Sequence, residues 1–306
     1  AMLLNNDVDP EVPEGTEYYL PAGSSYRVTP FALMKGFRLA GSRDGVKPIV
    51  VLEGSWSIAE GSYLSSLEFD NIEFRHEANN NYFMNTSKAY TIENVSFVNC
   101  DFISLRRGFW RHQSANAKYI MNLEMEGCRF EGCGWQTSAY GAFNLQSFDK
   151  DNGVSYDQVD RAIFRNCTFS NDNDGTNGYG WGNLFYAPYM DKPIDLEYKN
   201  VTIYNYSRNQ RLINIESAVG SKLVMEGILL ASPCGDLFAI GANTTTTFSN
   251  NYTTADYTLG GKNMNATDLK ITAVELFADP ANGDLTIKDT SSPIVSNRAG
   301  DTRWLP

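Results

Sequence analysis

Several residue types and patterns that serve metal, membrane or nucleic-acid functions are scarce in this sequence. It has two histidines, His76 and His112, and five cysteines in 306 residues, with no CxxC pair and no Cys/His spacing typical of a zinc site. No apolar run reaches the roughly 18 residues of a membrane-spanning helix. The net charge of −11 disfavours nucleic acid as a partner, and it disfavours a polyanionic ligand unless a local basic cluster or a cation offsets it.

Aromatic and turn-forming residues are abundant instead. The chain has 17 Tyr, 17 Phe, 5 Trp and 25 Gly, and asparagine is frequent. This mixture is typical of a β-rich extracellular protein with many turns. Several Asn-x-Ser/Thr sequons fall within the predicted strands, where a glycan would not fit, which favours a bacterial origin.

A six- to eight-residue unit recurs along the chain. The copies are LEFDNIEF (67–74), YTIENVSF (90–97), LEMEGCRF (123–130), AIFRNCTF (162–169), LEYKNVTI (196–203) and LVMEGILL (223–230). Each centres on Asn or Gly, at Asn71, Asn94, Gly127, Asn166, Asn200 and Gly227. The unit is constant while the spacer varies, which is how stacked coils with loops of different length behave.

Aligning these units produces apolar columns. The first contains Phe69, Ile92, Met125, Phe164, Tyr198 and Met225, the second Ile72, Val95, Cys128, Cys167, Val201 and Ile228, and the third Phe74, Phe97, Phe130, Phe169, Ile203 and Leu230. Polar residues alternate with them, so one face of each strand points inward. The central Asn or Gly tolerates a left-handed backbone, which predicts a bend between two short strands.

A second strand follows each unit. The segments are YFMNTS (82–87), FWRHQS (109–114), AFNLQS (142–147), LFYAPY (184–189), LINIES (212–217) and LFAIGA (237–242). Several short strands per coil, stacked coil upon coil, predict an all-β parallel β-helix. No segment keeps a helical period over three turns, and a β-sandwich would not align equivalent residues in columns. We assign 1–15 to an N-terminal extension, 16–260 to the β-helix and 261–306 to a C-terminal cap with a short helix and a final strand.

The repeated NxTF and NxxF coils, over roughly residues 16–260, resemble the pectate-lyase-like superfamily of single-stranded right-handed parallel β-helices. The ending, from ELFADPANGDLTIKDTSS to AGDTRW, is similar to that of uncharacterised β-helix proteins from bacterial polysaccharide-utilisation loci and of some polysaccharide lyases. The resemblance implies a secreted, periplasmic or cell-surface protein of a Gram-negative bacterium that meets plant-type or host glycans, with outer-membrane glycan-uptake components as partners. Lyases of the family use clustered Asp residues for calcium and an Arg or Lys base, and no residue-by-residue match to those motifs is found here.

The outward columns of the second strand predict a binding face. One contains Met84, Arg111, Asn144, Tyr186, Asn214 and Ala239, and the other Thr86, Gln113, Gln146, Pro188, Glu216 and Gly241. Amides match sugar hydroxyls as donors and acceptors, and Arg can hold a uronate carboxylate with two hydrogen bonds. The alternative is a plain polar surface.

The loops beside this face add residues that suit sugar stacking. They contain Arg106, Arg107, Trp135, Tyr140, Tyr179 and Trp181. Aromatic rings offer rigid area to the C–H faces of sugars, and long loops on a rigid scaffold often carry function. The alternative is that these aromatics cover the coil as a satellite core. We include Arg107, Tyr179 and Trp181 in the predicted binding site.

Catalysis at the same face has fewer candidates. In a lyase, Arg111 would neutralise a carboxylate and Tyr186 would act as acid or base. The column of His112 points inward, which predicts a buried, hydrogen-bonded histidine. Glycoside hydrolysis needs a carboxylate pair, and Glu216 has no partner in neighbouring columns unless the loop with Asp172 and Asp174 folds back.

Calcium and disulfide bonds are minor alternatives. A calcium-loop pattern laid on 170–181 begins with Ser170 and ends with Trp181 instead of Glu, so the strict motif fails, and Asp172 and Asp174 stay weak metal candidates. Cys100 and Cys133 would form a disulfide only if their Cα atoms approach within about 6 Å.

Three functions follow from these observations. The favoured one is recognition of a polysaccharide, with a pectin-like, uronate-containing chain as one option, along Arg111, Asn144, Tyr186 and Asn214. The second is a polysaccharide lyase or glycoside hydrolase that acts at the same face. The third is a structural or adhesin-like surface protein without a sugar site.

Overall fold

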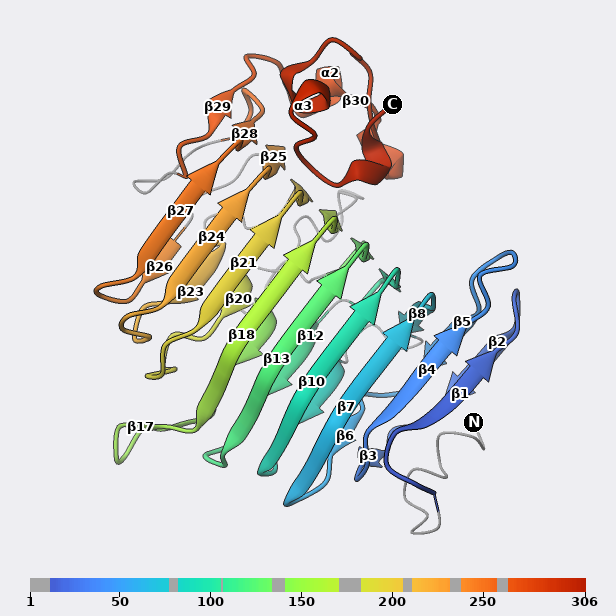
Figure 1. Cartoon of the computed structure of the whole chain (residues 1–306), viewed down its shortest axis with the longest axis vertical. Coiled ribbons are helices and arrows are strands. Elements are labelled where there is room, and N and C mark those ends of the chain that lie inside the picture. Colours follow the sequence, from blue (N-terminus) through green and yellow to red (C-terminus); the bar gives the residue numbers. More distant parts are fainter. Residues whose placement is uncertain are drawn as a thin grey trace.

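The computed structural model describes residues 12–76, 82–105, 107–133, 141–170, 183–205, 211–231, 238–257 and 264–306. Within this part of the chain, three parallel sheets contain most of the strands (Figure 1). We call them sheet 1, sheet 2 and sheet 3. In each full coil the chain passes from sheet 1 to sheet 2, then to sheet 3, and back to sheet 1.

Each coil adds its strands in sequence order. Sheet 1 contains β1 (Thr16–Leu20), β4 (Phe37–Gly41), β7 (Ser62–Asp70), β10 (Tyr90–Val98), β13 (Lys118–Glu126), β18 (Asp157–Arg165), β21 (Asp195–Lys199), β24 (Lys222–Glu226) and β27 (Thr245–Ser249). Sheet 2 contains β2 (Ser25–Val28), β5 (Ile49–Leu52), β8 (Glu73–His76), β11 (Asp101–Ile103), β14 (Arg129–Glu131), β19 (Thr168–Ser170), β22 (Thr202–Tyr204), β25 (Leu229–Ala231), β28 (Tyr252–Thr253) and β29 (Thr267–Asp268). Sheet 3 contains β9 (Tyr82–Thr86), β12 (Gly108–His112), β15 (Gly141–Leu145), β20 (Asn183–Tyr186), β23 (Ile213–Ile215) and β26 (Phe238–Ile240).

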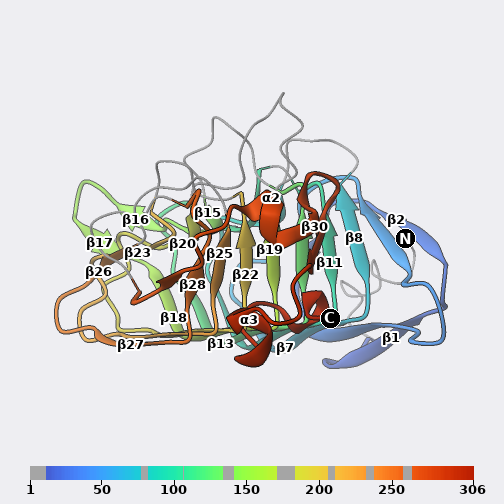
Figure 2. The same cartoon turned by 90° about the horizontal axis from the view of Figure 1, so that it is seen from above.

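The remaining elements lie at the ends and at one corner. β3 (Ala32–Leu33) and β6 (Ser57–Ile58) form a short parallel pair in the first coils, and β16 (Phe148–Asp149) and β17 (Val154–Ser155) form a hairpin that projects from the coils (Figure 2). The three sheets surround one apolar interior. The predicted all-β class is confirmed, and the stacked parallel strands are compatible with a parallel β-helix.

Residues with a left-handed backbone conformation form the bends between sheets 1 and 2. Asn71, Asn99, Asn166 and Asn200 have φ values of 57°, 50°, 49° and 52°, and Gly127 and Gly227 take the same position in their coils with φ values of 63° and 66°. Side-chain amides link neighbouring bends, because Nδ2 of Asn99 donates to Oδ1 of Asn71 at 2.7 Å. Both residue types were expected there because they tolerate this backbone region at low cost.

The predicted bend at Asn94 is wrong. Asn94 lies inside β10, and the bend of that coil is five residues later, at Asn99. β10 pairs with both neighbours so that Phe97 lies between Phe69 and Met125. This coil therefore contributes Phe97, Cys100 and Phe102 to the three apolar columns, in place of the predicted Ile92, Val95 and Phe97. Ile92 and Val95 are buried as well, earlier on the same strand. Asn94 and Asn99 both follow a segment with alternating apolar residues, so the local sequence does not distinguish them. The pairing between coils decides that the bend is at Asn99.

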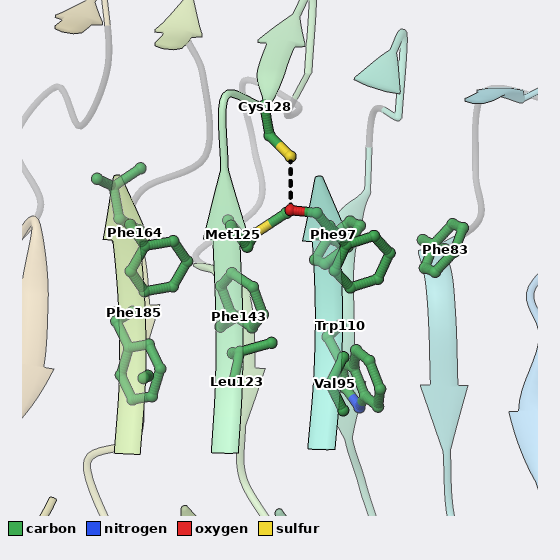
Figure 3. Packing of buried hydrophobic residues seen from close by; sticks show 14 of the residues in the cluster. Phe83, Val95, Phe97, Trp110, Leu123, Met125, Cys128, Phe143, Phe164 and Phe185 are labelled. Carbon is green, nitrogen blue, oxygen red and sulfur yellow. Dashed lines mark hydrogen bonds between the residues drawn. The ribbon is translucent and has the colours of Figure 1, made fainter. Parts of the chain in front are cut away.

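Equivalent side chains of successive coils lie next to one another in the core, as Phe97, Met125 and Phe164 do in Figure 3, and aromatic neighbours stack. Ring centroids are 4.7 Å apart for Phe69 and Phe97, and 4.6 Å apart for Phe164 and Tyr198, with nearly parallel planes in both pairs. Such spacing follows from the distance between paired strands, which places like side chains on top of one another.

The cysteines that the structure describes are buried thiols. None of Cys100, Cys128, Cys133 and Cys167 is in a disulfide bond, so the disulfide between Cys100 and Cys133 does not form. The Cys128 thiol donates to the Phe97 carbonyl at 3.4 Å (Figure 3). As expected, Cys128 and Cys167 act as small apolar residues of one column, which Cys100 joins.

Replacing Tyr198 with Phe is expected to stabilise the protein. Tyr198 is fully buried and its hydroxyl has no hydrogen-bond partner, so folding removes this group from water without compensation. We expect the free energy of unfolding to rise by about 1 kcal/mol, measured by denaturant unfolding. The matched variant Tyr90→Phe loses the hydroxyl that contacts His112 and should be destabilised. A loss of stability in Tyr198→Phe would contradict the argument.

The C-terminal segment lies along sheet 2. It contains α2 (Ala273–Leu276), β30 (Phe277–Asp279), the turn Pro280–Asn282, β31 (Asp284–Ile287), α3 (Pro293–Ser296) and the turn Thr302–Trp304, so the expected short helix and final strand are present. The Asp301 carboxylate accepts a 2.7 Å hydrogen bond from Thr168 on β19, and the Asp301 amide donates to Thr202 on β22 at 2.9 Å. The described part of the chain contains no helix with the length and apolar character needed to cross a membrane.

Candidate functional site

The strands of sheet 3 share an unusual side-chain order. In β12, Arg111 is half-buried and faces outward, whereas Phe109, Trp110 and His112 are fully buried and face the interior. Two consecutive inward residues interrupt the usual alternation. The same order recurs in β9, where Phe83 and Met84 are the consecutive buried pair.

The pairing register aligns the predicted outward column. Asn85, Arg111, Asn144, Tyr186, Asn214 and Ala239 pair in this order across six strands. The structure thus brings Arg111, Asn144, Tyr186 and Asn214 together as expected. The assignment of Met84 to this row is wrong: Met84 is buried and pairs with Trp110, and Asn85 takes its place. The reason is the second consecutive inward residue, which shifts the face of the following side chain.

Two glycines make room for tyrosine side chains on this face. A Cβ atom at Gly108 would lie 2.6 Å from Cε1 of Tyr82, and one at Gly141 would lie 2.9 Å from Cβ of Tyr186. Tyr82 was not among the predicted site residues. The sequence did contain a sign of this contact, because Gly108 and Gly141 are the first residues of β12 and β15. Glycine within a strand often marks a place where another group approaches the backbone closely.

The Tyr82 ring supports two predicted arginines. The guanidinium carbons of Arg107 and Arg111 both lie 5.4 Å from the ring centroid of Tyr82. A cation over an aromatic face is attracted by the negative potential of the ring. This arrangement places two positive groups together at one end of the row, in a protein whose net charge is −11.

Asn144, at the centre of the row, has an unusual environment. Its side chain is 1% exposed, and neither its amide nitrogen nor its carbonyl oxygen has a hydrogen-bond partner. Close by in the fold, Oδ1 of Asn85 and Nδ2 of Asn183 are also buried without partners. Each such group costs about 1–3 kcal/mol, so the row contains polar groups that the protein itself leaves unsatisfied.

Tyr186 follows Asn144 in the row and has charged neighbours. Partial burial, together with Tyr189 and Glu216, raises the pKa of its phenol, while Arg211 acts in the opposite direction. The phenol therefore stays protonated at neutral pH, which suits hydrogen-bond donation and acid catalysis better than action as a base. Glu216 forms a 3.2 Å ion pair with Arg211, and its backbone amide donates to Oδ1 of Asn214 at 3.3 Å.

Other predicted residues lie beside the row or outside the described ranges. Gln113 and Gln146 directly follow β12 and β15 and are half-buried. The predicted loop residues Arg106, Trp135, Tyr140, Asp172, Asp174, Tyr179 and Trp181 lie outside the described residues. Within the described ranges, no three His, Cys, Asp or Glu side chains gather in a way that could hold a metal ion.

His112 is buried beneath the row, as predicted. Its Nε2 lies 2.6 Å from the Tyr90 hydroxyl, and its Nδ1 lies 2.6 Å from Oδ1 of Asp157. Oδ2 of Asp157 accepts from the Ser147 amide at 2.6 Å, and the Lys118 ammonium donates to the Ser147 hydroxyl at 2.6 Å. Burial lowers the pKa of His112, although Asp157 opposes this, and burial lowers the pKa of Lys118 to about 8. A neutral His112 therefore donates to Asp157 and accepts from Tyr90.

Comparison with known proteins does not place the chain in a family. No protein-family model matches it, and a search of curated proteins found no match.

Proposed function

We propose that the chain is an exported right-handed parallel β-helix protein of the pectate-lyase-like kind, and that the outer face of sheet 3 binds a polysaccharide. The binding row consists of Asn85, Arg111, Asn144, Tyr186 and Asn214. Arg107 and Arg111 favour a glycan that carries carboxylates, such as a uronate-containing plant polysaccharide. Export to the periplasm or surface of a Gram-negative bacterium, alongside outer-membrane glycan-uptake components, is part of this proposal.

The unsatisfied amide of Asn144 is the observation that supports binding best. Because this side chain is 1% exposed, a sugar reaches it once the groups that cover it move aside. A sugar hydroxyl both donates and accepts, so two neighbouring hydroxyls can satisfy both ends of one amide. The groups of Asn85 and Asn183 would gain partners in the same way. An ordinary solvated surface does not explain why these polar atoms are buried without partners.

Catalysis finds less support in the described residues of the face. The one carboxylate in the predicted columns, Glu216, is paired with Arg211, and hydrolysis of a glycosidic bond uses two carboxyl groups. Tyr186 with its raised pKa lacks the character of a base at neutral pH. Recognition is therefore the function that we favour over lyase or hydrolase activity.

Affinity gel electrophoresis tests the proposal. Gels would contain polygalacturonate, galactan, xyloglucan or arabinan, each with and without calcium, and ultraviolet absorbance would detect unsaturated lyase products in parallel. We expect retardation without product, and about tenfold weaker binding for Asn144→Ala and Arg111→Ala, because each loses one or more ligand hydrogen bonds.

Matched controls lie on the outer face of sheet 1. Asn122→Ala and Arg161→Ala remove the same chemical groups from β13 and β18, and they should leave retardation unchanged. Asn144→Ala should also leave the stability of the free protein unchanged or higher, since the amide has no partner to lose. Product formation that Arg111→Ala abolishes would establish a lyase instead. Absence of retardation on every glycan would favour the structural alternative.

A further inference from the structure

A stacked aromatic pair lies to one side of the proposed binding row, past the C-terminal ends of β15 and β20. Phe148, on β16, and Tyr189, which follows β20, have ring centroids 4.3 Å apart and planes inclined by 14°. Tyr189 is 37% exposed, although its ring already contacts Phe148. A stack with one partner covers one face of a ring, so the opposite face of Tyr189 is the one that remains for a further contact.

The pair adjoins the row through short chain segments. Phe148 follows Asn144 by four residues, and Tyr189 follows Tyr186 by three. At about 3.3 Å per residue, the pair lies at most roughly 10–13 Å from the row, so a chain reaches it with one or two sugar units beyond those that contact the row. Tyr189 also contributes to the raised pKa of Tyr186, which agrees with their closeness.

Both rings are held on constrained backbone. The Ser217 hydroxyl donates to the Pro188 carbonyl at 2.5 Å, next to Tyr189. The Asp149 carboxylate accepts from the amides of Asp151 and Asn152 at 2.9 and 3.2 Å, which closes the hairpin that contains Phe148. A platform that is already ordered loses little conformational freedom when a ligand binds.

We infer that Phe148 and Tyr189 form an aromatic subsite that stacks on a pyranose ring of the bound glycan, where the glycan extends from the row past the ends of β15 and β20. The inference rests on the proposed function and refines it. The ligand class is a pyranose-based chain long enough to reach from Asn144 and Tyr186 to Tyr189. The C–H groups on one face of a pyranose supply the apolar surface that packs on an exposed tyrosine ring.

Substitution of Tyr189 tests the subsite. In the gel that retards the wild type most, we expect Tyr189→Ala to bind about two- to tenfold more weakly, and Tyr189→Phe to bind like the wild type, because the ring carries the contact. Hexasaccharides of that glycan should lose affinity in Tyr189→Ala, whereas disaccharides, too short to span both regions, should not. Tyr63→Ala, which removes a 57% exposed tyrosine from sheet 1, is the matched control.

The outcomes separate the two proposals. Equal binding by Tyr189→Ala and the wild type, with weaker binding by Arg111→Ala, would overturn the subsite and leave the row intact. An equal loss for disaccharides and hexasaccharides would likewise overturn it, because the effect would then come from a change in the row itself. If no polysaccharide retards the wild type, both proposals fail together.

Discussion

Replacing Asp157 with alanine is expected to lower the free energy of unfolding by about 3–5 kcal/mol, because it breaks a buried charged network. The carboxylate accepts from His112 and from the Ser147 amide, both inside the protein. Without it, these donors lose their acceptor, and the Lys118 ammonium loses the negative charge that most favours its protonated form. Unsatisfied buried donors and an uncompensated buried charge rank among the largest single-residue effects.

The measurement is denaturant unfolding at neutral pH, with Asp160→Ala as the control. Asp160 lies on the same strand, β18, but on the exposed side, so its removal should change stability little. If Asp157→Ala matched Asp160→Ala, the network would not contribute to the fold as we describe. His112→Phe should reproduce much of the loss, because it leaves Tyr90 and Asp157 without their common partner.

Replacing Phe102 with alanine is expected to cost about 3–5 kcal/mol of unfolding free energy. Phe102 is fully buried, and its ring stacks on Phe74 and Phe130 at centroid distances of 5.5 and 4.7 Å. It also makes edge contacts with Phe97 and Phe109. Backbone hydrogen bonds fix the spacing between neighbouring coils. The coils therefore cannot move into the space that the ring leaves.

A graded series makes this prediction specific. Phe102→Leu fills most of the space and should cost clearly less than Phe102→Ala in the same unfolding measurement. The exposed Tyr63→Ala serves as a surface control and should change stability little. Equal losses for Leu and Ala at position 102 would show that packing volume does not govern stability there.

The outward row illustrates how far sequence reasoning reaches. Alternation and alignment placed Arg111, Asn144, Tyr186 and Asn214 in one column, because their strands share the same local pattern. The same reasoning assigned Met84 in place of Asn85, since two consecutive inward residues cannot be distinguished from strict alternation in an apolar segment. Tyr82 was missed because its role depends on Gly108 of the next coil.

The partners of His112 show a second kind of limit. The inward direction of His112 followed from its column, and the structure confirms it. Its partners, Tyr90 and Asp157, lie 22 and 45 residues away along the chain. No local pattern marks such a pair, because the spacer between coils varies in length and hides which residues will become neighbours.

The sequence by itself determined the all-β class, most of the left-handed bends and the apolar columns. These features depend on side-chain alternation and on the backbone freedom of Asn and Gly, which are properties of short segments. Tertiary structure alone decided between Asn94 and Asn99, selected Asn85 over Met84, joined His112 to Asp157 and stacked Tyr189 on Phe148. Each of these choices depends on hydrogen bonding or packing between distant segments, and the competing local alternatives satisfy the same pattern equally well.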